Sequence, residues 1–234
     1  MRTSLAALPI LVISAALVSM TPAQAVTKEY VQLNSTGRAA VVTQLAEVPN
    51  WFGAVKVVQR PTATSSSATG ITAVDVCQQV EYAPPSSQGV SEYSAGSLTT
   101  IDSAMFQYTS PEKALAAWDA LVAQANDCRK TGSDSGVAST ARYYQRVDSM
   151  PRRYGTGGFT VLQSIIGTGE QTSIVYYDAY RLVGAAIIHT GYSRSLPRSL
   201  KTPPQQAPFR ATATVRILND RSSYRYRQLA YKAI

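Results

Sequence analysis

The chain has 234 residues, a formal net charge of +8 and a pI near 9.6. A chain of this length suits one domain, which buries about 70% of the surface that the unfolded chain exposes. It contains two cysteines and one histidine, which excludes a zinc site built from several nitrogen or sulfur ligands. We expect no metal and no cofactor.

The first 25 residues are typical of a secretory signal peptide. Arg2 precedes the apolar run Leu5 to Val18, and the small-x-small sequence Ala23-Gln24-Ala25 follows, so we expect cleavage before Val26. An N-terminal membrane anchor is the alternative. No later segment reaches about 18 consecutive apolar residues. The sequence therefore predicts a secreted, extracellular chain that does not span a membrane.

The next part of the chain mixes short patterns with polar loops. The stretch STGRAAVVTQLAEVPNWF begins as a short helix and ends with Trp51 and Phe52, which we expect to pack in the core. Residues 60–70 and the stretch YAPPSSQGVSEYSAG after Cys77 are rich in Ser, Pro and Gly, so both predict loops. The stretch TTIDSAMFQYT then alternates in hydrophobicity and predicts a strand.

The clearest helix follows Ser110. Ser110 is a favourable N-cap, and Pro111 is tolerated at the first helical position. Apolar residues recur at steps of three and four and predict the buried face: Leu115, Trp118, Leu121, Val122 and Ala125. Cys128 continues this stripe toward the core.

The two cysteines bear on the environment of the folded chain. Exported proteins fold under oxidising conditions, where two cysteines in one chain usually pair. We therefore expect a disulfide between Cys77 and Cys128. Two buried free thiols are the alternative.

Residues 159–190 form the clearest β region. Three successive strands are predicted, with a turn at residues 167–169 and a tight link near Tyr180 and Arg181: Phe159–Ile166, Thr172–Tyr180 and Leu182–Thr190. The third strand is apolar on both faces, which predicts a central position. The fold class is therefore α+β, an antiparallel sheet with helices packed on it.

The positive charge is concentrated near the C-terminus. Residues 194–234 hold nine Lys or Arg against one acid, Asp220. The stretch SLPRSLKTPPQQAP predicts a linker, FRATATVRIL a strand, and the whole segment a separate basic module. Its expected partners are anionic envelope polymers or lipid headgroups and not nucleic acid, which an exported protein seldom meets. A solvated tail without a partner is the alternative. The candidate binding residues are Arg221, Arg225, Arg227 and Lys232.

No catalytic signature is present. The single His189 has no serine in a G-x-S-x-G elbow to act on, and a packed imidazole is the plain interpretation. The fourteen acidic residues offer many pairs for two-carboxylate hydrolysis, so the sequence selects none. Tyr176, Tyr177 and Arg181 are candidates for a ligand cleft, with ordinary strand residues as the alternative.

Three features together resemble one known family. They are the secretory leader, the stretch LAEVPNWF, and a capped helix of the form S-P-x-x-A-x-x-A-W…C. This combination, over roughly residues 45–190, resembles the PknH-like extracellular sensor domain of mycobacterial receptor kinases and secreted actinobacterial proteins. The matching residues are Ser110, Pro111, Ala114, Ala117, Trp118 and Cys128, with Cys77 as the expected partner of Cys128.

The resemblance implies a cleft-bearing α+β fold with a non-enzymatic binding or sensing function and an unknown ligand, and we expect this domain to span residues 26–193. The chain departs from the family in two respects. The family fold has two disulfides, whereas two cysteines allow only one, and the basic segment after Arg194 matches nothing in the family. The function expected from the sequence is a secreted sensor-like domain of the cell envelope that binds a small molecule or an envelope component. An extracellular carboxylate-based hydrolase and an adhesin for anionic envelope polymers are the alternatives.

Overall fold

The computed structural model describes residues 29–65, 86–96, 98–131, 142–153, 156–166, 173–197, 199–200, 204 and 206–232. The expected signal peptide, Cys77 and the turn at residues 167–169 lie outside these residues. Cys128 lies on a described helix, but its side chain is not among those described. The disulfide therefore stays a prediction.

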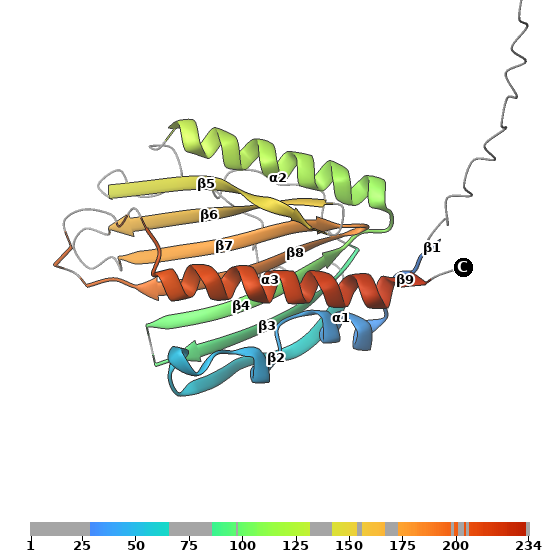
Figure 1. Ribbon diagram of the computed structural model, residues 1–234, viewed down its shortest axis with the longest axis horizontal. Helices are drawn as coiled ribbons and strands as arrows, with labels where there is room; N and C mark the ends of the chain where they lie inside the picture. The colour runs from blue at the N-terminus through green and yellow to red at the C-terminus, as the bar shows by residue number, and fades with distance from the viewer. Residues whose placement is uncertain are drawn as a thin grey trace, which may run out of the picture.

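A seven-stranded antiparallel sheet forms the body of the molecule (Figure 1). Its order is β2-β3-β4-β8-β7-β6-β5, so the late strand β8 is inserted between β4 and β7. The strands are β2 (Val55–Ser65), β3 (Ser87–Ala95), β4 (Thr99–Gln107), β5 (Arg142–Arg153), β6 (Thr156–Ile166), β7 (Ile174–Val183) and β8 (Ala186–Ser195). The predicted α+β class and the central position of the third strand are both confirmed.

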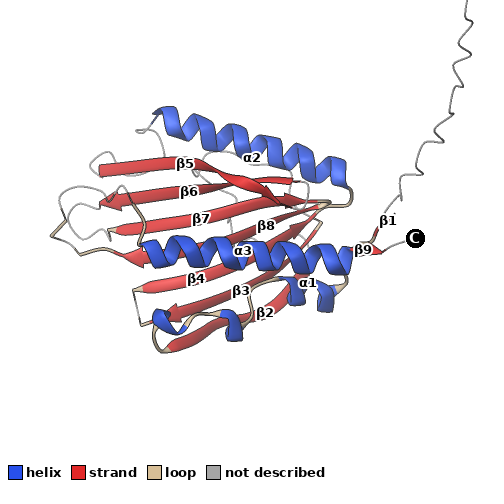
Figure 2. Ribbon diagram, viewed as in Figure 1, coloured by secondary structure: helices blue, strands red, loops and turns tan. Residues whose placement is uncertain are grey.

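Helices cover both faces of this sheet (Figure 2). Helix α2 (Pro111–Thr131) packs on one face, and α1 (Ser35–Val41) and α3 (Phe209–Ala230) pack on the other. Two short 3-10 turns, η1 (Leu45–Glu47) and η2 (Asn50–Phe52), follow α1. The two-residue strands β1 (Glu29–Tyr30) and β9 (Tyr231–Lys232) pair with each other. Among the described helices, none is long and apolar enough to cross a membrane.

Helix α2 begins as predicted, but its buried face differs in part from the predicted stripe. The Ser110 hydroxyl caps the helix by accepting a hydrogen bond from the Lys113 amide, at 3.3 Å. Leu115 is 49% exposed, contrary to prediction. Leu121 and Ala125 are buried as predicted, together with Ala114 and Ala117, which the prediction left out. The buried face therefore runs through positions 114, 117, 121 and 125, and Leu115 lies beside it on the outer side.

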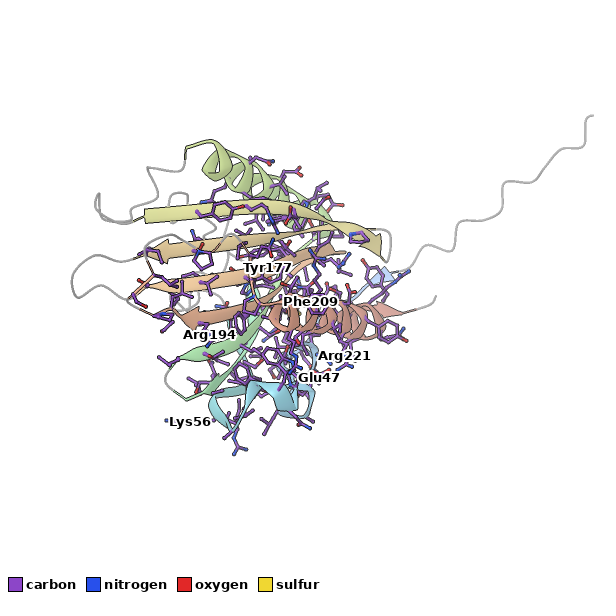
Figure 3. All side chains as sticks on the ribbon, turned by 60° about the vertical axis from the view of Figure 1, so that its left-hand side comes forward. Glu47, Lys56, Tyr177, Arg194, Phe209 and Arg221 are labelled. Atoms are coloured by element: carbon purple, nitrogen blue, oxygen red, sulfur yellow. The ribbon has the colours of Figure 1, made fainter. Side chains whose placement is uncertain are left out.

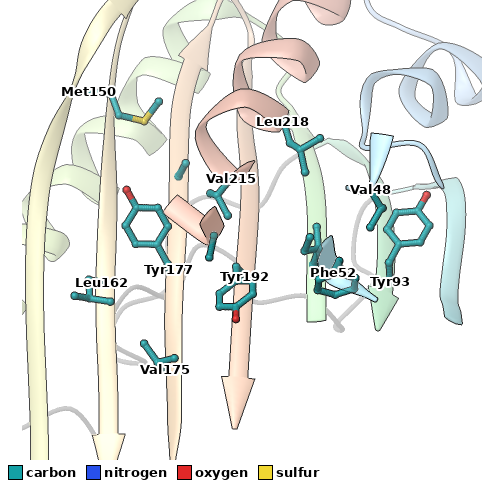
Figure 4. Packing of buried hydrophobic residues seen from close by; sticks show 13 residues of the cluster. Val48, Phe52, Tyr93, Met150, Leu162, Val175, Tyr177, Tyr192, Val215 and Leu218 are labelled. Carbon is teal, nitrogen blue, oxygen red and sulfur yellow. The ribbon is translucent and has the colours of Figure 1, made fainter. Parts of the chain in front are cut away.

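A second apolar cluster lies between α3 and the sheet (Figure 4). Val215 and Leu218 project from the helix onto the sheet, where Tyr177 and Tyr192 belong to the same cluster. Phe52 is buried in this cluster, and Trp51 packs at its edge. Their predicted role as core anchors is confirmed.

The stretch FRATATVRIL was predicted to be a strand, and this prediction is wrong because it forms the first half of α3. Its alternation places Phe209 inward in a strand, yet Phe209 is exposed in the structure. The buried residues Ala211, Val215 and Leu218 follow the helical steps of four and three. These buried residues are few and stand among Thr and Ala, so the helical spacing is hard to recognise in the sequence.

Three strand boundaries also differ from prediction. The stretch expected to be a loop after Cys77 contains β3, and β2 extends to Ser65 inside the other expected loop. The link between β7 and β8 falls at Gly184 and Ala185 and not near Tyr180. Gly184 has a φ of +54°, a conformation that glycine adopts without steric cost, so the turn forms there.

Candidate functional site

Strand pairing brings three carboxylates into one row on the sheet face that α2 partly covers. Glu92 on β3 pairs with Asp102 on β4, which pairs with Gly191 on β8, which pairs with Asp178 on β7. We call these three carboxylates the acid row. Its members come from three separate strands, and only the insertion of β8 between β4 and β7 brings Asp102 and Asp178 to either side of Gly191.

The glycine in this row is necessary for the arrangement. A Cβ atom placed on Gly191 would lie 2.5 Å from Asp102 Oδ1 and 2.7 Å from Asp178 Oδ1. Both carboxylates therefore lean over the same glycine from opposite sides. Any side chain at position 191 would force at least one of the two carboxylates away.

His189 lies between the two aspartates, one step along β8 on the same face. Its Nε2 atom is 3.0 Å from Asp178 Oδ1, and its Nδ1 atom is 3.3 Å from Asp102 Oδ2. The imidazole is only 3% exposed, whereas the side chains of Asp102 and Asp178 are 26% and 21% exposed. The ring also packs on Tyr180, with 4.8 Å between ring centroids. The histidine is thus a buried support beneath two carboxylates that solvent reaches.

The crowding of charge changes how these groups titrate. Burial raises the pKa of Asp102 to about 6; the charge of His189 opposes this rise, and the charges of Asp178 and Glu92 add to it. Burial by itself lowers the pKa of His189, but Asp102 and Asp178 outweigh that effect and raise it above the ordinary value. The two carboxylates therefore favour the protonated form of the imidazole relative to an isolated histidine.

A row of neutral polar side chains lies beside the acid row, toward the start of β4. It contains Thr100, Ser193, Tyr176 and Gln163 from four adjacent strands. The hydroxyls of Thr100 and Ser193 contact each other, and all four side chains are partly exposed. The acid row, His189 and this neutral row together form what we call the polar patch.

The polar patch combines paired carboxylates with hydroxyl and amide groups. Among the described residues, no group of three His, Cys, Asp or Glu is placed to hold a metal ion. The polar patch suits a ligand that brings a positive charge and hydrogen-bonding groups.

The candidate cleft residues do not lie together. Tyr176 belongs to the polar patch, where burial and then the charge of Asp178 raise its pKa. Tyr177 points to the opposite face, toward α3 (Figure 4), where its hydroxyl accepts a hydrogen bond from Arg216 Nε at 3.0 Å. Arg181 is also on that face, buried and bonded to Asp220 at 2.8 Å. Tyr177 and Arg181 therefore help to hold α3 on the sheet.

The candidate basic residues are also in different settings. Arg221 is exposed and Arg227 is half-buried. Arg225 is partly buried and paired with Glu47 at 2.6 Å. Lys232 lies on β9, but its side chain is not described.

His189 was identified from the sequence, but its two carboxylate partners were not. Asp102 and Asp178 both lie in strands that the sequence predicted, although the predicted strand of Asp178 ends at Tyr180 and β7 continues to Val183. The pairing of β4 with β8, which brings Asp102 beside His189, could not be inferred from the order of the strands in the sequence.

No protein-family model matches the sequence, and no curated protein does either. The crystal structure of the extracellular domain of PknH from Mycobacterium tuberculosis does match, with a TM-score of 0.52 and 11% sequence identity. The match covers 86% of this chain and 100% of that one. The fold is similar to that of the PknH extracellular domain. At this identity the likeness concerns the fold, and the resemblance drawn from the sequence is confirmed at that level.

Proposed function

We propose that this chain is an extracellular sensor-like domain that binds its ligand at the polar patch. The fold similarity to the PknH extracellular domain supports the general class. The location of the proposed binding site rests on one observation: the carboxylates of Asp102 and Asp178 both lie over Gly191. Two partly exposed carboxylates held this close repel each other, and a ligand that relieves the repulsion gains free energy on binding.

The expected ligand is an organic cation, such as a molecule with a primary ammonium group. The acid row carries three carboxylates, and His189 can offset at most one of these negative charges when its ring is protonated. An ammonium group donates up to three hydrogen bonds and fits between carboxylate oxygens. The neutral row of Thr100, Ser193 and Gln163 would bind the polar remainder of the ligand, and Tyr176 would offer an aromatic face to the cation.

The test uses the diamine putrescine and its uncharged analogue butanediol as probes. Calorimetry and thermal shift should detect binding of putrescine and not of butanediol, weakened by salt. Asp178→Asn should lower the affinity by about tenfold or more. Asp119→Asn removes the same charge from an exposed position on α2 and should leave the affinity unchanged. Equal responses to both probes, or equal effects of the two variants, would reject the proposal.

A hydrolase is the second candidate, and one observation favours it. A carboxyl group with its pKa near 6, such as Asp102, beside a second carboxylate is the pairing that glycoside hydrolysis requires. Turnover of nitrophenyl glycosides that is lost in Asp102→Asn and in Asp178→Asn, and retained in Asp119→Asn, would support this function. Absence of turnover together with putrescine binding would leave the sensor-like domain as the proposal.

A further inference from the structure

The outer side of α3 carries a pattern that the packing of the helix does not explain. The buried residues Ala211, Val215 and Leu218 face the sheet. The opposite side, at the same helical spacing, presents Arg210, Ile217, Arg221 and Tyr224. Arg210 and Arg221 are exposed, and Ile217 and Tyr224 are 51% and 50% exposed. We call these four residues the outer stripe of α3.

The outer stripe is positive and is not balanced by the acids closest to it in sequence and structure. The sequence of α3 includes five arginines and one acid, Asp220. Asp220 is bonded to the buried Arg181 on the sheet side. Glu47, near the other flank of the helix, is bonded to Arg225. The charges of Arg210 and Arg221 therefore remain available to an external anion.

Apolar side chains alternate with the charged ones along the outer stripe. This alternation helps to distinguish a membrane surface from a soluble polyanion as the partner. Ile217 lies between Arg210 and Arg221, and Tyr224 lies one turn beyond Arg221. A soluble polyanion would use the two guanidinium groups and leave Ile217 and the Tyr224 ring in water. A bilayer surface uses both kinds of group, because phosphates bind guanidinium while aliphatic and aromatic side chains enter the headgroup boundary.

We propose that the outer stripe of α3 docks the domain onto an anionic membrane surface. The helix is already folded and fixed on the sheet by Asn219, whose Nδ2 atom donates to the carbonyls of Ala179 at 2.9 Å and Ile188 at 3.1 Å. Docking therefore costs no folding of the helix. The surface is separate from the polar patch, which lies on the opposite face of the sheet.

The experiment measures co-sedimentation of the chain from Val26 onward with vesicles. Vesicles of phosphatidylglycerol and phosphatidylcholine should bind the protein, and phosphatidylcholine alone should bind it weakly. Arg210→Gln/Arg221→Gln should reduce the partition coefficient by about tenfold or more, at roughly fivefold per arginine. The control Lys56→Gln/Lys113→Gln removes the same charge from exposed sites elsewhere (Figure 3 shows Lys56 far from Arg221) and should retain most of the binding.

A second variant tests the choice of partner. Ile217→Ser/Tyr224→Ser keeps the charge, and it should weaken binding to anionic vesicles while leaving retention on soluble polyphosphate unchanged. Circular dichroism should confirm that each variant is folded. Equal loss in the arginine variant and its lysine control would overturn the proposal. So would full vesicle binding by Ile217→Ser/Tyr224→Ser, which would indicate a polyanion in place of a membrane.

Discussion

Arg225 Nη1 donates to Glu47 Oε1 across 2.6 Å, although 178 residues separate the two in sequence. The same guanidinium donates through Nε and Nη2 to the carbonyl of Val41 and through Nη2 to that of Val42. Arg225 therefore closes the end of α1 and fastens α3 to it. An arginine that the sequence suggested for surface binding has its donors directed into the fold.

Replacing Arg225 should destabilise the protein. Arg225→Ala removes the ion pair with Glu47 and the guanidinium donors to the carbonyls of Val41 and Val42, so we expect a loss of about 2–4 kcal/mol in the free energy of unfolding. Arg225→Lys should recover part of this, because an ammonium cannot reach all three acceptors. Urea titration measures both. Arg221→Ala, at an exposed site, is the control and should cost less than about 0.5 kcal/mol; a similar cost for the two alanine variants would contradict the prediction.

The polar patch should make stability depend on pH. The pKa of Asp102 is about 6 in the folded state, against 3.8 as the ordinary value, so the folded state holds this proton more tightly. Stability should therefore fall as pH rises from about 4 to about 6, by up to about 3 kcal/mol. His189 acts in the same direction at higher pH. Its raised pKa gives stability that is complete below about 6.5 and is lost as pH rises through the folded value.

Two variants separate these contributions. Asp102→Asn should flatten the pH profile of unfolding free energy between about 4 and 6, and His189→Gln should flatten it above about 6.5. Urea unfolding at a series of pH values measures the profiles. An Asp102→Asn variant whose profile keeps the wild-type slope in the lower range would show that this carboxyl group titrates normally.

Trp118 should contribute to stability through an aromatic contact. Its ring packs on Phe159 with 5.2 Å between centroids, and it flanks the cluster beneath α2. Since the indole is only half-buried, Trp118→Ala should cost about 3 kcal/mol, at the lower end for this change. Leu115→Ala on the exposed side of the same helix should cost far less. Chemical denaturation compares the two, and equal losses would place the indole outside the core.

The disulfide between Cys77 and Cys128 remains a prediction. If it forms, intact mass should lie two hydrogens below the reduced value, and alkylation without reductant should modify no thiol. Its removal should lower stability by about 4 kcal/mol, because the bridge closes a long loop in the unfolded chain. Reactive thiols in unfolded protein prepared under oxidising conditions would exclude it.

The sequence predicted correctly those elements in which capping residues or a clear hydrophobic pattern indicate one structure. Helix α2 has a capping serine and a proline at its start, and β4 and β6 have strong hydrophobic patterns. Strand β3 was missed because its sequence SQGVSEYSA resembles a loop, and pairing with two neighbours stabilises it instead. The first half of α3, residues 209–218, was misassigned because its apolar and polar residues alternate as they would in a strand. The buried polar residues of the second half, Asn219, Ser222 and Ser223, add no hydrophobic period that would reveal the helical face.

The candidate site was less predictable than the fold. His189 was identified as a strand residue, but its role depends on Asp102 and Asp178 from the two neighbouring strands. Asp178 faces His189 across the local hairpin of β7 and β8, but Asp102 reaches it only through the pairing of β8 with β4, which local patterns do not specify. The necessity of Gly191 is likewise visible only when both carboxylates lie over it.

The pairing of β1 with β9 has a consequence for presentation of the domain. The ladder lies at the end of the sheet where β7 turns into β8, since the Tyr231 hydroxyl lies against Gly184. Chain on either side of the described fold therefore leaves from one place, whereas the neutral row of the polar patch lies toward the other end of the strands. A fusion partner or surface linkage at either terminus would therefore attach to the same end of the sheet, and the neutral row would lie away from the attachment. Immobilisation through either end should thus give the same ligand response on a biosensor.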